Sequence, residues 1–306
     1  MHNTPLHLDV SDSLHGLRLD QAISLAFPEH SRSRLKIWIL HGRVWVNDQP
    51  VTRPREMVSE GDKIRIDPET VIAVHWGAED MPLSIVYEDE HLLVINKPAD
   101  LVVHPGAGNP SGTLVNALLH HCPSLAQVPR AGIVHRLDKD TTGLMVVAKT
   151  IVAQTGLVAA MQARAVKRVY EAIVYGVMVS GGTVDLPIGR HPRDRTRMAV
   201  IQSGREAITH YRVIKRFKAH THVRLQLETG RTHQIRVHMA HKRHPIVGDS
   251  AYGKRFSVES LKSFKRQALH ARQLALTHPL SAEPLSWEAP LPLDMQTLLA
   301  MLAANI

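Results

Sequence analysis

The 306-residue chain has one cysteine, few aromatic residues and no long apolar run. The lone Cys122 excludes an intramolecular disulfide and a zinc site built from cysteines. Four Trp, five Tyr and four Phe are too few for the broad stacking platform of a single-strand nucleic-acid binder. No segment approaches the roughly 18 apolar residues of a membrane span, and the N-terminus lacks a signal peptide's apolar core. We therefore expect a cytoplasmic protein that does not bind membranes.

Basic residues outnumber acidic ones, which gives a formal net charge of +9. Such an excess favours a polyanionic partner, because Lys and Arg that neutralise phosphates drive association with nucleic acids. Arg32, Arg34, Lys36 and Arg43 lie in a stretch without acids, and we expect them to contact the backbone of folded RNA. A solvated helix face would have the same composition. The densest basic stretch, residues 186–218, is a second candidate for an RNA groove.

The chain is predicted to contain two domains joined by a linker at residues 76–82, where glycine, proline and acids gather. Residues 1–75 would form a small domain and residues 83–306 a larger one. Nine Lys and Arg against ten Asp and Glu give the small domain a net charge of −1. The positive charge of the chain therefore belongs to the larger domain.

In the small domain, apolar spacing predicts two helices and then short strands, over residues 17–27, 31–42, 43–49 and 62–66. Ser31 can cap the second helix, in which Leu35, Trp38 and Ile39 would face one core. The larger domain is predicted to alternate strands with helices. We expect strands over residues 83–87, 91–96, 168–175 and 225–228, and helices over 114–121, 150–163 and from Thr232 to about 242.

The chemistry is expected at residues 132–143 (GIVHRLDKDTTG), which precede an apolar run. Asp138 and Asp140 are two residues apart, so in an extended chain they would project from one face and could share a site. The alternative is an Asx-type turn between two buried strands, in which both aspartates and the following threonines only shape the chain.

A rival interpretation is a magnesium-dependent phosphatase, since residues 138–142 fit the Asp-x-Asp-x-Thr pattern of haloacid-dehalogenase-type enzymes and Gly248-Asp249 is similar to a later motif. Against it, His135 and Arg136 interrupt the strand that should precede Asp138, and no second Asp closely follows Asp249. Four histidines, at 233, 238, 241 and 244, could suggest a metal site. Their spacing on a helix is poor and no nearby acid or cysteine completes a ligand set, so we expect no metal.

Two resemblances to known families cover almost the whole chain. Residues 17–20 (LRLD), 31–34 (SRSR), 42–47 (GRVWVN) and 60–62 (EGD) resemble the small RNA-binding domain first named from ribosomal protein S4. The remainder resembles the RluA-type pseudouridine synthases, especially their RluD-like branch. That likeness rests on motifs at residues 96–98 (NKP), 104–106 (HPG), 132–138 (GIVHRLD), 142–144 (TGL), 170–172 (YEA), 228–238 (ETGRTHQIRVH), 244–249 (HPIVGD) and 267–271 (QALHA).

The resemblance implies an α+β fold: a catalytic domain with a central mixed, mostly antiparallel sheet flanked by helices, preceded by the small α/β RNA-binding domain. The implied reaction breaks the C1′–N1 bond of uridine in RNA, turns the uracil and rejoins it through C5. No redox change or phosphoryl transfer occurs, so no cofactor or metal is implied. The implied partner is 23S rRNA or the large ribosomal subunit particle, with uridines of the helix 69 stem-loop as targets, and nothing demands more than a monomer.

The resemblance also implies roles for individual residues. Asp138 matches the essential carboxylate, which either attacks as a nucleophile or takes the ribose 2′ proton to give a glycal. Arg231 matches the basic partner that keeps this carboxylate ionised and oriented. Tyr170 matches the residue that stacks on the target base and assists proton removal from C5. Arg136 would fill the gap left by the departing uridine, and Ile235 would contact the uracil.

A third interpretation is a ribosome-assembly factor that binds RNA but is catalytically silent. The presence of Asp138, Tyr170 and Arg231 argues against it.

Overall fold

The computed structural model describes residues 4–28, 30, 32–68, 76–106, 108–253, 261 and 264–304. The chain divides into two compact units, Met1–His75 and Trp76–Ile306. Ser31, the predicted helix cap, lies outside the described residues. None of the helices in the described ranges is long and apolar enough to cross a membrane.

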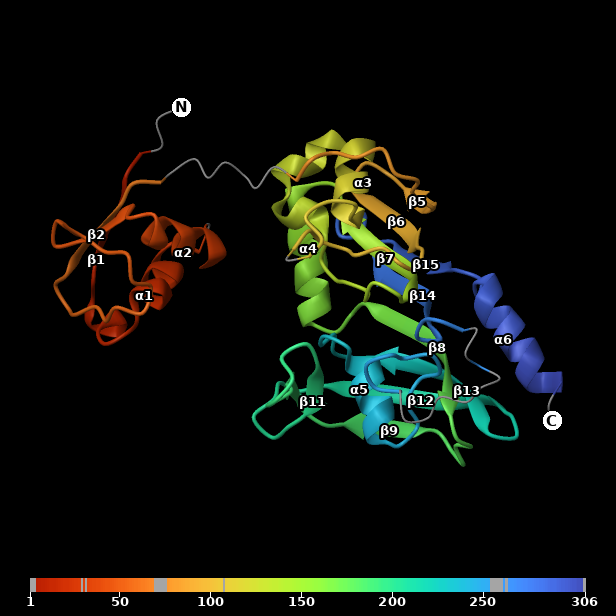
Figure 1. The fold of residues 1–306 in the computed structure, drawn as a ribbon. Coiled ribbons are helices and arrows are strands. Elements are labelled where there is room, and N and C mark those ends of the chain that lie inside the picture. Colours follow the sequence, from red (N-terminus) through yellow and green to blue (C-terminus); the bar gives the residue numbers. More distant parts are fainter. Residues whose placement is uncertain are drawn as a thin grey trace. The chain divides into compact units, whose positions relative to one another are not determined.

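The small unit packs two helices on a four-stranded antiparallel sheet (Figure 1). Leu35, Trp38 and Ile39 are buried in its core, as their spacing predicted. The strand nearest the N-terminus was not predicted; its four residues pair with the last strand of the unit. The helices are α1 (Leu19–Ala26) and α2 (Arg32–Leu40), and the strands in sheet order are β1 (Leu6–Asp9), β4 (Lys63–Ile66), β2 (Val44–Val46) and β3 (Gln49–Pro50).

The large unit is built on a nine-stranded sheet; among its described strands, the pairing between β7 and β14 is parallel and the others are antiparallel. Its fold is therefore the mixed, mostly antiparallel α+β fold that was predicted. The order across the sheet is β5 (Ile85–Glu88), β6 (Leu92–Lys97), β7 (Thr142–Ala148), β14 (Leu269–Thr277), β8 (Lys167–Tyr175), β13 (His220–Leu227), β12 (Ile208–Arg216) and β9 (Gly182–Asp185), with β15 (Pro284–Glu288) also on β14. Thus β14, which comes late in the chain, lies between β7 and β8.

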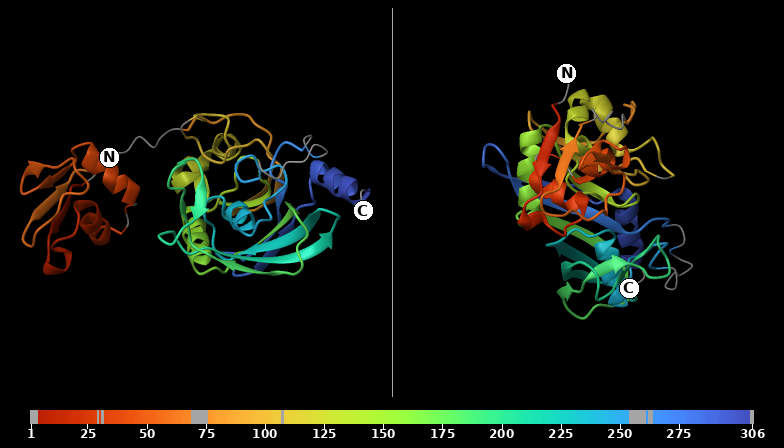
Figure 2. Two further views of the ribbon diagram at one scale, coloured as in Figure 1. Left: turned by 60° about the horizontal axis from the view of Figure 1, so that its bottom comes forward. Right: turned by 90° about the vertical axis from the view of Figure 1, so that its left-hand side faces the viewer.

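Helices cover both faces of this sheet. On β6 and β7, alternate side chains pack with α4 (Ile151–Gln162) on one face and with α3 (Leu114–His121) on the other. Figure 2 shows α5 (Gln234–His241) lying over the concave side of the curved strands β12 and β13. A separate hairpin of β10 (Ile188–Arg190) and β11 (Met198–Val200) lies beside α5, and α6 (Leu293–Ala304) ends the described chain.

Residues 76–82, where a linker was predicted, pack against the large unit. Trp76 and Met81 contact its main core. The Glu79 backbone N–H donates to the Asn116 carbonyl (3.0 Å), and the Asn116 side chain donates to the Gly77 carbonyl (2.7 Å). Backbone polar groups of this segment are thus satisfied by the start of α3.

Lys97, at the end of β6, is fully buried and supports the turn that follows Asp138. Its ammonium donates to the carbonyls of Pro98, Leu101 and Lys139, at 2.7, 2.8 and 2.8 Å. Burial lowers the pKa of Lys97 to about 8, against the opposing effect of Asp140 and Asp138. The lysine therefore remains protonated at neutral pH.

We expect Lys97→Met to lower the free energy of unfolding by about 1–3 kcal/mol, because three carbonyls lose a charged donor that methionine cannot replace. Lys139→Met is the matched control, since its ammonium forms an exposed ion pair with Asp100 that contributes little. Urea denaturation measures both. Equal stability of Lys97→Met and the native protein would contradict a structural role for this ammonium.

Candidate active site

Asp138 lies in a tight turn that leads into the buried strand β7. The Thr141 N–H donates to the Asp138 carbonyl (3.0 Å), and Arg266 donates to the Asp140 carbonyl (3.2 Å). Of the two alternatives that the sequence left open, the structure therefore shows the turn and not an extended chain with Asp138 and Asp140 on one face. Asp138 lines a cavity and Asp140 does not.

This cavity, of about 1050 Å³, collects residues from four separate parts of the large unit. Those four parts, which carry the predicted site residues, are the turn before β7, β8, the loop after β13 and α5; α4, β14 and the segments around His104 and Arg205 line other parts of the cavity. All five residues assigned to catalysis or uridine binding line it: Arg136, Asp138, Tyr170, Arg231 and Ile235. Tyr170 and Ile235 are buried, whereas Arg136 is exposed at the cavity edge.

The basic partner of Asp138 is Arg236, not Arg231 as predicted. Nη1 of Arg236 donates to Oδ2 of Asp138 at 2.8 Å. Arg231 instead donates from Nε to the Glu206 carbonyl (2.9 Å). Burial, together with nearby Arg205, lowers the pKa of Arg231.

Asp249 anchors Arg236 from the other side. The guanidinium donates from Nε and Nη2 to the two carboxylate oxygens of Asp249, at 2.7 and 2.9 Å. Burial alone would lower the pKa of Arg236, but the bonds to Asp249 and Asp138 outweigh it and raise that pKa. This bidentate geometry fixes the plane of the guanidinium and so the position of Asp138. Arg236 and Asp249 both lie in family motifs, but sequence spacing did not indicate that they meet.

The start of α5 explains why Arg236 rather than Arg231 reaches Asp138. The predicted cap, Thr232, is not the N-cap; the helix begins after His233, which has a left-handed backbone (φ 56°). The Gln234 side chain accepts the Arg231 N–H (2.9 Å) and folds the preceding loop onto the helix end. Arg231 therefore lies outside the helix and Arg236 within its first turn.

The phosphatase alternative is not supported by this geometry. It requires Asp140 beside Asp138, yet Asp140 is outside the cavity. Both carboxylate oxygens of Asp249 are bound by Arg236.

The histidines of the same segment have separate hydrogen-bond partners. His238 contacts Thr209 (2.9 Å) and the Leu186 carbonyl (3.0 Å), and His244 contacts the Tyr175 carbonyl (2.8 Å). His233 contacts the Tyr252 hydroxyl (2.9 Å). These contacts direct the three side chains to different parts of the unit.

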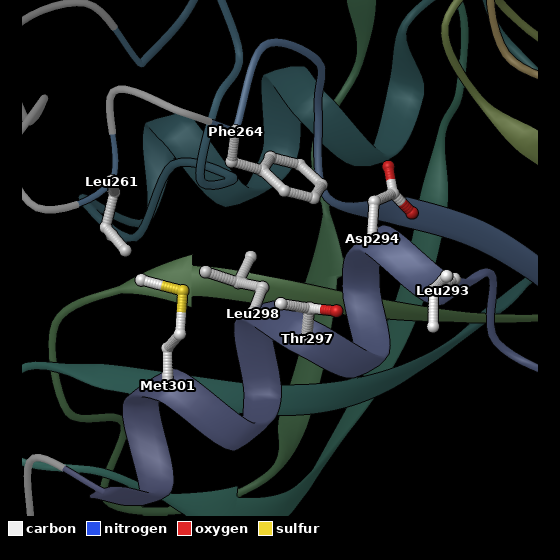
Figure 3. A pocket seen from close by; sticks show the side chains of 7 residues that line it. All are labelled: Leu261, Phe264, Leu293, Asp294, Thr297, Leu298 and Met301. Atoms are coloured by element: carbon white, nitrogen blue, oxygen red, sulfur yellow. The ribbon is translucent and has the colours of Figure 1, made fainter.

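A second cavity, of about 480 Å³, lies along α6 and is mostly apolar (Figure 3). Leu261 and Phe264 face the helix across it, and Leu298 and Met301 project from the helix side. Its one carboxylate, Asp294, is bound by both Nε and Nη2 of Arg266, at 2.6 and 2.8 Å. The carboxylate in this cavity is therefore engaged in an ion pair.

Basic side chains surround the larger cavity. Besides Arg236 and the two predicted arginines, four more line it: Arg130, Arg164, Arg168 and Arg205. Arg205 belongs to the basic stretch 186–218, whose other residues include the β10–β11 hairpin. In the small unit, Arg32 and Lys36 are exposed on α2 and Arg43 is exposed just before β2; the Arg34 side chain lies outside the described part. RNA contacts by these four residues stay a prediction.

Comparison with protein families gives two matches. A family model described as RNA pseudouridylate synthase matches residues 91–241, and one described as S4 domain matches residues 17–64.

Curated relatives match over nearly their whole length. The chain is 58% identical over 303 residues to Ribosomal large subunit pseudouridine synthase D of Pseudomonas aeruginosa, covering 96% of this chain and 94% of the relative. It is 55% identical over 305 residues to the proteins of the same name in Salmonella typhimurium and Escherichia coli, covering 97% of this chain and 94% of each relative.

Two solved structures are also similar. Human RNA Pseudouridylate Synthase Domain Containing 4 aligns with a TM-score of 0.57 and 30% identity, over 72% of this chain and 93% of that one. For Human RNA Pseudouridylate Synthase Domain Containing 1 the TM-score is 0.55 and the identity 26%, over 74% of this chain and 97% of that one.

Proposed function

Because the chain belongs to the RNA pseudouridylate synthase family, we propose that it converts uridine to pseudouridine in the 23S rRNA of the large ribosomal subunit. Both the family and the S4 domain were predicted from sequence motifs, and the comparisons confirm them. The observation that carries the proposal is a single carboxylate, Asp138, held by Arg236 in a cavity of about 1050 Å³. We further propose the stem-loop of helix 69 as the target.

Asp138 supplies the group that starts the reaction. Arg236 binds Oδ2 and leaves Oδ1 as the oxygen that acts on the ribose. This oxygen either attacks C1′ or takes the 2′ proton to give a glycal, and both routes require a carboxylate without a proton on this oxygen. The C1′–N1 bond then breaks, and uracil turns to present C5 to C1′.

Tyr170 and Ile235 hold the uracil while it turns. Both side chains line the cavity, and the tyrosine ring offers a flat face for stacking on a base. Burial raises the pKa of Tyr170, so its hydroxyl keeps its proton near neutral pH. This supports a stacking role for Tyr170 more than a role as a base.

A uridine in a duplex must leave its stack to enter this cavity, which costs a few kcal/mol and less in a loop or bulge. Arg136, exposed at the cavity edge, is suited to fill the gap that the base leaves. Contacts between the other arginines around the cavity and RNA phosphates would offset the cost.

The proposal is tested by mapping pseudouridines in rRNA from cells that lack this protein. We expect the modification to disappear from helix 69 and to return when the native protein, but not an Asp138→Asn variant, is supplied. Losses only at other sites would overturn the helix 69 assignment. An unchanged map would favour the silent assembly factor.

Binding of rRNA by the small unit gives a separate prediction. We expect the double variant Arg32→Ala, Lys36→Ala to bind rRNA more weakly and to reduce the salt slope of binding by about one for each phosphate that is no longer neutralised. Arg53→Ala, Arg55→Ala is a matched control, since it removes two basic side chains of the same unit outside the predicted stretch. Filter binding across a range of salt concentrations measures the slope. Equal slopes for both double variants would contradict a phosphate-binding role for α2.

A further inference from the structure

His233 lies at the start of α5, with its ring between Asp138 and Tyr252. Its Nδ1 is 2.9 Å from the Tyr252 hydroxyl, and its Nε2 is 3.8 Å from Oδ1 of Asp138. The side chain lines the cavity and is 21% exposed. Its backbone is left-handed (φ 56°), a conformation that costs energy for a residue with a Cβ and is often found at functional sites.

The second half of the proposed reaction needs a proton acceptor close to Asp138. Once C5 is bonded to C1′, it still carries the proton that uridine had there. Because Asp138 acts at C1′ or at the adjacent C2′, this proton lies close to the Asp138 carboxylate. A general base must come within hydrogen-bonding distance of the proton it removes. His233 Nε2 is placed beside the oxygen that faces the ribose.

Other titratable groups in the cavity are less suited to this step. Burial raises the pKa of the Tyr170 hydroxyl. The hydroxyl therefore stays neutral near pH 7, and a neutral phenol is a weak proton acceptor. Glu206 and Glu228 are both engaged by the Arg164 guanidinium, at 2.6 and 2.9 Å.

The remaining histidines of the cavity wall are also committed or enclosed. Nε2 of His135 accepts the Val146 N–H (3.0 Å). Nε2 of His104 is buried, so it cannot act as a base in the cavity.

Building on the proposed function, we propose that His233 Nε2 accepts the proton that leaves C5. The C5–H bond breaks, and its electron pair restores the C5=C6 double bond of the uracil. The proton moves to Nε2, and N1, which lost its bond to C1′, takes up one proton from the imidazolium or from water. Product and substrate then contain the same atoms, and no oxidant or co-reactant is needed.

The surroundings of His233 fit an acceptor that is neutral before the step and charged after it. Burial lowers its pKa below the ordinary value, although the Asp138 carboxylate acts in the opposite direction. Arg236 and Arg136 also lower this pKa, and Asp249 raises it. The imidazolium formed would lie beside Asp138, which stabilises the positive charge.

Tyr252 acts as a positioning residue for this ring. Its hydroxyl oxygen accepts the Met198 N–H of β11 (2.9 Å). The same hydroxyl is in hydrogen-bonding contact with His233 Nδ1 (2.9 Å). Its aromatic ring is flanked by the guanidinium groups of Arg197 and Arg236, at 5.0 and 5.2 Å from the ring centre. The proposal requires the tautomer in which Nδ1–H donates to the phenol oxygen, so that the Nε2 lone pair faces the cavity.

The test uses the full chain and rRNA whose target uridines carry hydrogen or deuterium at C5. In His233→Asn, which retains a residue that tolerates the left-handed backbone, we expect single-turnover formation of pseudouridine to fall by about 10²–10⁴-fold. The C5 isotope effect should rise, because proton removal becomes rate-limiting. At pH values well below the His233 pKa, proton removal should become rate-limiting in the native protein as well, because a protonated ring cannot accept; the rate should then fall and the C5 isotope effect should rise, and this pH dependence should vanish in the variant.

Rate loss without a larger isotope effect would indicate a structural role for His233 and overturn the proposal. A larger isotope effect in Tyr170→Phe with none in His233→Asn would assign the proton to Tyr170 instead. His233→Gln, whose amide can still contact Tyr252, repeats the measurement if the asparagine variant unfolds. A native protein that forms no pseudouridine would refute the proposed function itself, whereas full activity of both His233 variants would refute only the proton acceptor.

Discussion

Replacing Asp138 with asparagine is expected to slow pseudouridine formation by about 10⁴-fold or more while leaving the affinity for rRNA nearly unchanged. The amide has the shape of the carboxylate but can neither attack C1′ nor take the 2′ proton. RNA affinity should persist because the basic side chains around the cavity remain. Single-turnover assays on 23S rRNA, paired with equilibrium binding, separate the two effects.

Asp140→Asn is the matched control, since this carboxylate is two residues away and outside the cavity. We expect it to retain most of the native activity. Substantial turnover by Asp138→Asn would contradict the assignment of Asp138 as the catalytic carboxylate. Equal losses in both variants would restore the two-carboxylate site that the turn geometry argues against.

The second large effect is expected for Arg236→Lys, with a decrease in turnover of about 10²–10³-fold. A lysine keeps the charge but has one ammonium, so it cannot bind both oxygens of Asp249 and also reach Asp138. The unfolding free energy should fall by about 1–3 kcal/mol, since part of a buried hydrogen-bond network is removed. Single-turnover rates and urea denaturation measure these changes.

Arg231→Lys provides the comparison for that variant. Its contact with the Glu206 carbonyl does not involve Asp138, so we expect a change of only a few-fold, mainly in the apparent affinity for RNA. A larger loss of turnover in Arg231→Lys than in Arg236→Lys would show that Arg231, and not Arg236, is the functional partner of Asp138.

Local sequence patterns predicted much of this fold. The helix over residues 114–121 has the predicted bounds. Its residues have helical apolar spacing, and a capping box of Thr113 and Asn116 fixes where it begins. The strand over 168–175 was also predicted closely, since its side chains are apolar on both faces and it is central in the sheet.

The sequence did not specify which side chains meet in the site, because that depends on the backbone conformation of the loops. Arg231 and Arg236 occur in one motif, and only the left-handed turn at His233 decides which of them reaches Asp138. Asp249 lies in a motif of the resemblance, but no role was predicted for it, because its pairing with Arg236 depends on how α5 packs. The sequence also left open whether Asp138 and Asp140 share one site, and the turn decides that they do not. The misassigned partner of Asp138 and this open choice both concern side-chain direction and not residue type.

The position of β14 between β7 and β8 also determines when the enzyme can become active during its synthesis. The turn with Asp138 precedes β7, Tyr170 lies on β8, and Arg236 is on α5, while β14 begins only at Leu269. A growing chain that ends before this strand has both halves of the site but no strand to join them. Non-local pairings of this kind form slowly, because the intervening chain must close first. We therefore expect a chain still being translated to lack a complete site until β14 has emerged.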